Sequence, residues 1–238
     1  MPRLPSITER LNRKPLSVVE RLQREVFVSS LRQMNLHNAK ALSVSCGDGI
    51  WDYLSLSWNT GVSAITATDV VECPVKSGDV ELLRSLGEWS FQQVVPGAVL
   101  PFSSDSFDVA FSQDVIEHTP RPFHFLSEQY CVLRGGGRVI VGTPNVLRPA
   151  NLVRALLGKL QFPMTIGHFE EIGDYVHAQE FHEQQLKLML EEVGFVDVAV
   201  IPLYFGLSML NVSFSDYPQE GVGRTLAHFL LATGRKPS

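Results

Sequence analysis

Two glycines and an aspartate have the types and spacing of a nucleoside-binding site. Gly47 and Gly49 follow the short apolar run Ala41–Val44 and precede amphipathic sequence, an order that indicates a strand, a tight turn and a helix. Glycine has no Cβ, so the backbone can pass close to a ligand, and the start of the helix presents free N–H groups. Asp69 ends the next predicted strand, about 20 residues after Gly49, where the acidic residue of a βαβ nucleotide-binding unit holds ribose hydroxyls. The spacing therefore predicts a nucleoside-binding loop, and an ordinary β–α turn is the alternative.

The elements that must position these residues alternate between apolar strands and amphipathic helices. We predict strands in the stretch that begins at Ala41 and at residues 62–68, 90–95, 107–112 and 138–142. Helices are expected after Gly49, near residues 79–86 and at residues 123–133. This alternation predicts a parallel sheet with helices on both faces. Ligands of such sheets bind at the carboxyl ends of the strands, so the residues expected to converge on one crevice are Asp48, Asp69, Leu100, Gln113, His118 and Asn145.

The composition indicates a globular protein and restricts its partners. The 238 residues are 45% hydrophobic and 19% charged, which suits one α/β domain with a sizeable core. The net charge of −5 and the lack of a basic patch give no reason to expect a nucleic-acid partner. The N-terminus lacks the apolar core of a signal peptide, and no run approaches the roughly 20 apolar residues that span a bilayer, so a cytoplasmic protein without a membrane partner is expected. Cys46, Cys73 and Cys131 form no Cys-x-x-Cys pair, which argues against a disulfide framework or a thiolate zinc site.

The chain is expected to form a short arm and one domain. Three prolines lie among polar and basic residues at the start of the chain, so residues 1–15 are predicted to be a flexible arm. Residues 16–238 are predicted to be a single domain that begins with an amphipathic helix, capped by the Ser-x-x-Glu box at Ser17. Insertions near residues 146–180 and 203–223 contain many aromatic residues, which suit the covering of an apolar or planar ligand. Satellite core beneath long loops is the alternative for these aromatic residues, and a large insertion could also form a homodimer surface.

A run of short motifs resembles the sequence of a known family. The motifs are, in order, Leu100-Pro101-Phe102, Ser106-Phe107-Asp108, Glu117-His118, Leu133-Arg134-Gly135-Gly136 and Thr143-Pro144-Asn145. Later stretches of the same kind are His177-Ala178-Gln179-Glu180-Phe181, Val193-Gly194-Phe195 and Ala232-Thr233-Gly234-Arg235-Lys236. Together they resemble the class I S-adenosylmethionine-dependent methyltransferases, particularly the group that acts on small molecules. The resemblance implies an α/β fold with a Rossmann-like, seven-stranded, mostly parallel sheet, helices on both faces and an antiparallel last strand.

The same resemblance implies a site for S-adenosylmethionine and a small-molecule methyl acceptor, with a hydroxyl oxygen as the expected acceptor atom. The implied cofactor contacts are Ser45, Cys46, Gly47, Asp48 and Gly49 with the methionine moiety, Asp69 and Val70 with the ribose, Gly97 and Ala98 beside the adenine, and Gln113 and Asp114 at the methionine end.

Three positions depart from the family pattern. Ser43 stands where the family usually has an acidic residue, and Ser45 stands where it has a third glycine. Pro96 lies near the position of an aspartate that commonly contacts the adenine amino group. A degenerate, non-catalytic member that serves as a binding or scaffold protein is therefore the alternative to an enzyme.

His118 is the candidate catalytic base. Methyl transfer from a sulfonium needs a nucleophile held in line and, for a hydroxyl acceptor, a base. Histidine is largely neutral near pH 7 and can accept that proton. In this family group, Glu-His also occurs as a structural helix start, which is the alternative role.

A divalent metal ion is a further alternative at the same place. Asp114, Glu117 and His118 match the acidic-x-x-Glu-His arrangement of subgroups that methylate catechol or ribose hydroxyls with a metal ion, and His177 or His182 could add a ligand. Carboxylates and imidazoles suit a hard or borderline cation that holds a hydroxyl as its anion. Because such residues more often face solvent or cap helices, the primary prediction contains no metal.

Overall fold

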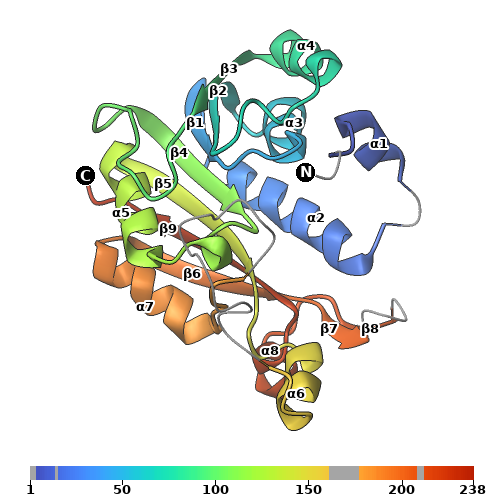
Figure 1. The fold of residues 1–238 in the computed structure, drawn as a ribbon. Helices are drawn as coiled ribbons and strands as arrows, with labels where there is room; N and C mark the ends of the chain where they lie inside the picture. Colours follow the sequence, from blue (N-terminus) through green and yellow to red (C-terminus); the bar gives the residue numbers. More distant parts are fainter. Residues whose placement is uncertain (1–3, 14–15, 161–176, 208–211) are drawn as a thin grey trace.

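Seven strands form the central sheet in the order β3-β2-β1-β4-β5-β9-β6 (Figure 1). They are β1 (Ala39–Val44), β2 (Val62–Asp69), β3 (Glu88–Gln93), β4 (Phe107–Gln113), β5 (Leu133–Pro144), β6 (Val196–Leu203) and β9 (Phe229–Arg235). The computed structural model describes residues 4–13, 16–160, 177–207 and 212–238. Strand β9 runs antiparallel to its neighbours β5 and β6. The pairs β3–β2, β2–β1, β1–β4 and β4–β5 are parallel. The predicted seven-stranded, mostly parallel sheet with an antiparallel last strand is confirmed.

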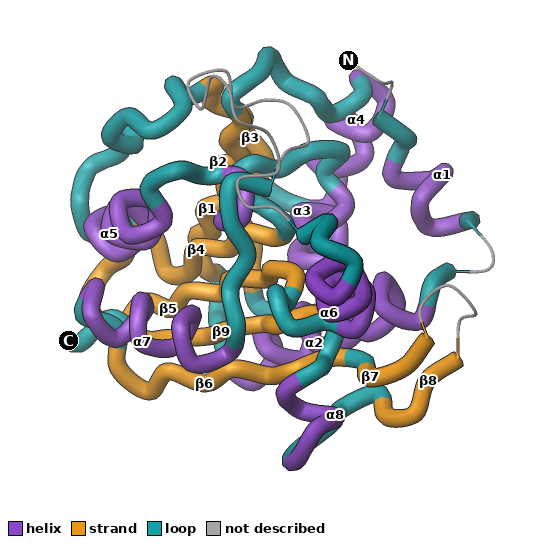
Figure 2. Tube along the Cα trace, turned by 60° about the horizontal axis from the view of Figure 1, so that its bottom comes forward, coloured by secondary structure: helices purple, strands orange, loops and turns teal. Residues whose placement is uncertain are grey.

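Helices pack on both faces of the sheet, as Figures 1 and 2 show. One face carries α2 (Val18–Gln33), α3 (Ile50–Ser57) and α4 (Ser77–Leu86), and the other carries α5 (Pro122–Val132) and α7 (Glu183–Val193). Side chains alternate along each strand, so that Phe111 of β4 joins the first core cluster and Ala110 joins the second. Burial on both faces explains why these strands appear in the sequence as nearly continuous apolar runs.

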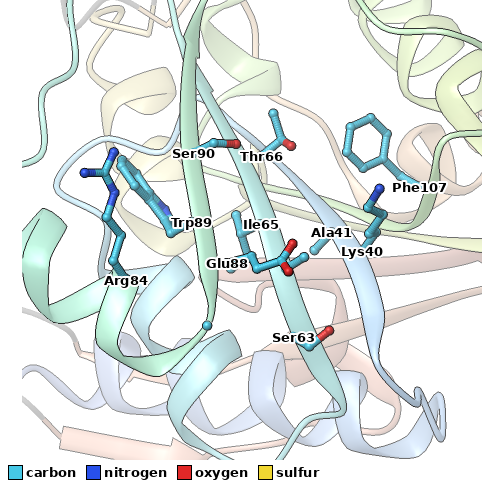
Figure 3. Close-up of a pocket in the computed structure, with 12 residues that line it drawn as sticks. Lys40, Ala41, Ser63, Ile65, Thr66, Arg84, Glu88, Trp89, Ser90 and Phe107 are labelled. Atoms are coloured by element: carbon cyan, nitrogen blue, oxygen red, sulfur yellow. The ribbon is translucent and has the colours of Figure 1, made fainter.

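Among the described helices, none lies over β2 and β3 on the face of the sheet that carries α5 and α7. Residues 94–106, between β3 and β4, form turns and loop instead of a helix. A cavity of about 740 Å³ lies beside the start of these strands, and Figure 3 shows polar side chains such as Lys40, Thr66 and Ser90 around it. The carboxyl end of β2, where Asp69 stands, contributes nothing to its lining. This cavity is therefore separate from the expected site.

The arm predicted at residues 1–15 contains a helix, which corrects the expectation that it has no structure of its own. Helix α1 (Ile7–Asn12) begins with a capping box in which the Ser6 hydroxyl accepts from the Glu9 N–H at 3.1 Å. The Ile7 side chain is fully buried in the first core cluster, and its N–H donates to Asp79 Oδ2 of α4 at 3.0 Å. The cap and the buried side chain together outweigh the prolines that suggested an unstructured segment.

The two expected insertions contain short elements at the lower edge of the molecule in Figure 1. These are α6 (Pro149–Leu156), the hairpin β7 (Phe205–Leu207) and β8 (Val212–Ser215), and α8 (Gly221–Thr225). Part of the first insertion, residues 161–176, lies outside the described residues. Tyr204 is fully buried against His228, so this aromatic residue belongs to the core. Among the helices described, none is long and apolar enough to cross a membrane.

A buried carboxylic acid connects α3 to the sheet. Asp52 of α3 is fully buried, and its Oδ2 accepts a hydrogen bond of 2.8 Å from the indole N–H of Trp89 on β3. It packs beside Ser43, the position where the family has an acidic residue. Burial raises the pKa of Asp52 to about 7, so at mildly acidic pH the group is neutral in the folded protein. The acid that strand β1 lacks is thus present nearby, on the following helix.

The burial of Asp52 predicts a pH-dependent stability. Between about pH 4 and pH 7 the folded state holds a proton on Asp52 that the unfolded state releases, so the free energy of unfolding falls as the pH rises. We compare the free energy of unfolding from denaturant titrations at pH 5 and at pH 8. Between these two pH values the free energy of unfolding of the wild type should fall by about 2–3 kcal/mol more than that of Asp52→Asn, because the asparagine has no such proton. Glu81→Gln, an exposed change on α4, should follow the wild type. Parallel pH profiles of Asp52→Asn and the wild type would contradict this account.

Candidate functional site

A cavity of about 480 Å³ lies at the carboxyl ends of β1, β2 and β4. Every implied cofactor residue except Gly49 lines it, and so do Leu100 and His118. Asn145, which was expected in the same crevice, is not among the lining residues. Its buried amide donates instead to the carbonyls of Thr225 and Ala227, at 3.0 and 2.8 Å, so its role is to fix the chain before β9.

The turn between β1 and α3 has an unusual backbone. Ser45, Gly47 and Gly49 all have positive φ angles, of 57°, 54° and 80°. Ser45 therefore adopts the left-handed conformation that glycine favours, although it carries a side chain. A Cβ added to Gly47 would meet no atom within 4 Å, because the cavity lies directly above it. The turn thus leaves open space over exposed backbone, as a closely bound ligand requires.

Asp69 fixes this turn to the end of β2. Its Oδ2 accepts from the N–H of Gly47 at 3.1 Å, and its Oδ1 accepts from the N–H of Val70 at 2.8 Å. The side chain is nearly buried but still lines the cavity. The N–H of Val71 also donates to Oδ1, at 3.5 Å. Oδ2 has one hydrogen bond and keeps further lone-pair capacity, so Asp69 can also accept from ligand hydroxyls. Cys46, by contrast, is buried, and burial and the nearby carboxylates raise the pKa of its thiol, which argues against a reactive thiolate.

Gln113 is the last residue of β4, Asp114 follows it, and both line the same cavity. Neither polar atom of the buried Gln113 amide has a hydrogen-bond partner within the described part of the chain. Gly142 of β5 makes room for it, since a Cβ there would lie 1.9 Å from Gln113 Oε1. Asp114 is exposed, and its carboxylate is open to the cavity. Both residues offer polar atoms to a ligand.

The segment between β3 and β4 also lines the cavity, with Gly97, Ala98 and Leu100. Pro96 also lines it and offers no carboxylate. Glu128 of α5 supplies one there, and its Oε2 accepts from the N–H of Leu100 at 2.7 Å.

His118 forms a cluster with Glu117, which is buried, and His177; both imidazoles are partly exposed. The ligand atoms of these three residues all lie within 4.8 Å of one another, and the two imidazole rings pack edge to face at 4.9 Å. Glu117 is fully buried; its Oε2 accepts from the Thr143 hydroxyl at 2.9 Å, whereas Oε1 has no partner among the residues described. Burial and the neighbouring Asp114 raise the pKa of Glu117 well above its ordinary range.

Asp114 and His182, the two other metal candidates, lie outside this cluster. His182 caps α7, where its Nδ1 accepts from the Gln185 N–H at 3.4 Å. His177 is oriented by Glu180, whose Oε1 lies 2.5 Å from its Nδ1.

The N-terminal helices supply lining residues that the sequence analysis did not predict. Leu4 lines the cavity from the segment before α1, Arg10 from α1 and Gln23 from α2. Trp51 of α3 lines the same cavity. The Ser6–Glu9 capping box was a sequence signal for α1, but nothing in the sequence shows that this helix packs against the turn at Gly47.

Comparisons with known proteins agree with this geometry. Residues 42–141 match a family described as a methyltransferase domain. The chain is 28% identical over 126 residues to a ubiquinone biosynthesis O-methyltransferase of Pseudomonas putida, covering 53% of each protein. It is also 28% identical over 145 residues to the enzyme of the same description from Azotobacter vinelandii, covering 61% of this chain and 60% of the relative. The chain therefore spans about half to three-fifths of the length of these curated relatives.

Solved structures share the fold at low sequence identity. A methyltransferase from Thermotoga maritima, described as a possible histamine N-methyltransferase, aligns with a TM-score of 0.59 and 18% identity over 97% of this chain and 98% of that one. The CurJ carbon methyltransferase aligns with a TM-score of 0.65 and 18% identity over 94% of this chain and 56% of that one. These structures and the sheet order show the class I methyltransferase fold, and within it residues 42–141 match the methyltransferase-domain family.

Proposed function

We propose that the protein transfers a methyl group from S-adenosylmethionine to a hydroxyl oxygen of a small molecule. The observation that carries this proposal is a single cavity that joins the turn at Gly47, the carboxylate of Asp69 and the imidazole of His118. The cofactor supplies a methyl group already activated on a sulfonium. The chain therefore has to hold two molecules in line and accept one proton.

The residues present fit this cofactor. Space above Gly47 admits the amino-acid part, Asp69 faces the position of a ribose, and the unpartnered Gln113 amide needs a ligand group to satisfy it. The left-handed backbone of Ser45 keeps the turn in the shape that a glycine would give. These features support an enzyme over the non-catalytic alternative suggested by Ser43, Ser45 and Pro96.

Cofactor binding should depend on Asp69. By isothermal titration calorimetry, S-adenosylhomocysteine should bind the wild type, and Asp69→Asn should weaken binding roughly 10- to 100-fold, because a charged acceptor for the ribose and for Gly47 is lost. Asp197→Asn, an exposed aspartate that pairs with Arg235 on the sheet edge, is the matched control and should bind normally. A wild type that binds nothing at millimolar concentration would remove the enzyme proposal.

His118 is proposed as the base that accepts the acceptor's proton. It lines the cavity near Gln113 and Asp114, at the end expected to hold the methyl group. With a hydroxyl acceptor, His118→Ala should lower kcat roughly 10²- to 10⁴-fold while the affinity for S-adenosylhomocysteine changes little. His124→Ala removes another imidazole of the same cavity and should retain turnover. Unchanged turnover in His118→Ala would exclude this role.

A metal-assisted reaction is a second candidate, favoured by the Glu117–His118–His177 cluster. A buried carboxylate oxygen without a partner, next to two imidazoles, is a ligand set that suits a divalent cation. Glu180 on His177 Nδ1 resembles the outer-shell carboxylate that orients metal-binding histidines, leaving Nε2 as the coordinating atom. A cation here would hold the acceptor hydroxyl as its anion.

Chelation separates the two candidates. If a metal takes part, turnover should be lost in a chelator and recovered with magnesium or zinc, and Glu117→Gln and His177→Ala should abolish metal binding measured by calorimetry. His182→Ala, which removes only a helix cap, should bind metal as the wild type does. Full turnover in chelator, with His177→Ala still active, would leave His118 as a base alone.

A further inference from the structure

Strand β3 forms one edge of the central sheet and is regular along its length. Among the described strands it pairs with β2 alone, and the pairing of its six residues contains no register shift. The opposite edge strand, β6, is interrupted, because Asp197 has a positive φ of 54° and the pairing with β9 shifts between Val196 and Ala199. Proteins commonly protect an edge with such a bulge, since an open edge offers unpaired backbone groups to another strand. The edge at β3 has no bulge of this kind.

The backbone groups of every second residue of β3 face this edge. The N–H of Val94 donates to the Asp69 carbonyl of β2 at 2.9 Å, so alternation along the strand turns the backbone groups of Trp89, Phe91 and Gln93 away from β2. The Gln93 carbonyl already accepts from the side-chain amide of the preceding residue, at 3.0 Å. Trp89 and Phe91 therefore offer the N–H and C=O groups that a further strand can pair with.

Alternation also restricts how a second copy of β3 can pair at this edge. In an antiparallel pair, two residues that lie directly opposite each other both point toward the partner strand or both point away. A two-fold axis that relates two copies must therefore pass through a residue of β3, not between two residues. An axis at Ser90 places Trp89 opposite Phe91 of the second copy, so that the two residues with free backbone groups bind each other on both sides of the axis.

The side chains of β3 are complementary to themselves in this register. Ser90 and Glu88 are exposed and line the open cavity of about 740 Å³ (Figure 3). The small Ser90 lets two copies approach at the axis, and Glu88 lies opposite the exposed Gln92 of the second copy, whose amide can donate to the carboxylate. Next to the two ends of the strand, Leu86 and Val95 are 38% and 71% exposed. The antiparallel direction brings Leu86 of one copy beside Val95 of the other.

We propose that the protein forms a homodimer by antiparallel pairing of β3 with β3 of a second copy, with the two-fold axis at Ser90. The sheets of the two copies then join into one, and the exposed apolar side chains beside both ends of β3 are buried. Residues 94–98 follow β3 directly and line the candidate cofactor cavity, so the pairing also supports one wall of each site. This surface is distinct from the insertions, which lie at the lower edge of the molecule in Figure 1.

A cysteine at the axis tests this register. Opposite residues that both point away from the partner strand have Cα atoms about 4.5 Å apart, which a disulfide can span. With oxidised glutathione, which takes up the two electrons and two protons of the paired thiols, Ser90→Cys should give a covalent dimer on a non-reducing gel. Gln92→Cys is the matched control on the same exposed face of β3. Its two copies would lie about 13 Å apart along the strands, so it should link no more than the wild type, which carries exposed Cys73 and Cys131.

Lysine substitutions test the pairing without a covalent bond. Ser90→Lys places like charges opposite each other and should raise the dimer dissociation constant, measured by sedimentation equilibrium, roughly 5-fold or more. Gln92→Lys adds the same charge opposite Glu88 of the second copy, so the dimer should be kept or tightened. The proposal would be overturned by a monomeric wild type, by equal cross-linking of the two cysteine variants, or by a dissociation constant that Ser90→Lys leaves unchanged. These measurements need no ligand, so their result is independent of the proposed function.

Discussion

The candidate site depends on the hydrogen bond between the Gly47 N–H and the Asp69 carboxylate. The turn from Ser45 to Gly49 needs left-handed backbone at three positions, one of which carries a side chain, and such conformations persist only when surrounding contacts enforce them. Asp69 provides that enforcement from the neighbouring strand, because parallel pairing of Val44 with Thr68 brings the two strand ends level. The side chain that shapes the turn is therefore also a wall of the cavity, and its orientation is fixed before any ligand arrives.

The sheet and the centre of the site could be predicted because they depend on local sequence. Strands buried on both faces give continuous apolar runs, and glycines and aspartates at their ends mark the turns, so Asp69 and Gln113 could be placed at the correct edge. Thr143-Pro144-Asn145 also ends a strand, yet Asn145 lies outside the cavity lining. The end of a strand fixes the position of a residue along the sheet edge but not the direction of its side chain. Here the Asn145 amide donates to two backbone carbonyls before β9 and does not reach the cavity.

The contribution of the N-terminus could not be read from the sequence in the same way. The contact of Arg10 with Asp48 joins residues 38 positions apart and depends on the docking of Ile7 into a core assembled mainly from other elements. Likewise, Asp52 is one polar residue on a short helix in the sequence, and only packing against Trp89 reveals it as a buried acid beside Ser43. Tertiary contacts of this kind leave no periodic signal.

The distribution of unpartnered polar atoms separates the needs of the fold from those of the site. Buried polar groups are nearly always paired, and an unpaired one costs about 1–3 kcal/mol. Within the described residues, several such atoms belong to side chains that line one cavity, namely Arg10, Gln113 and Gln129, and the unpaired oxygen of Glu117 lies beside His118 of the same wall. A sequence selected for stability alone would pair or replace these groups. Other unpartnered buried atoms belong to Arg24, Asp52, Ser112 and Arg148, which do not line this cavity. The atoms at the carboxyl edge of the sheet differ from these because a molecule bound in the cavity can pair with them.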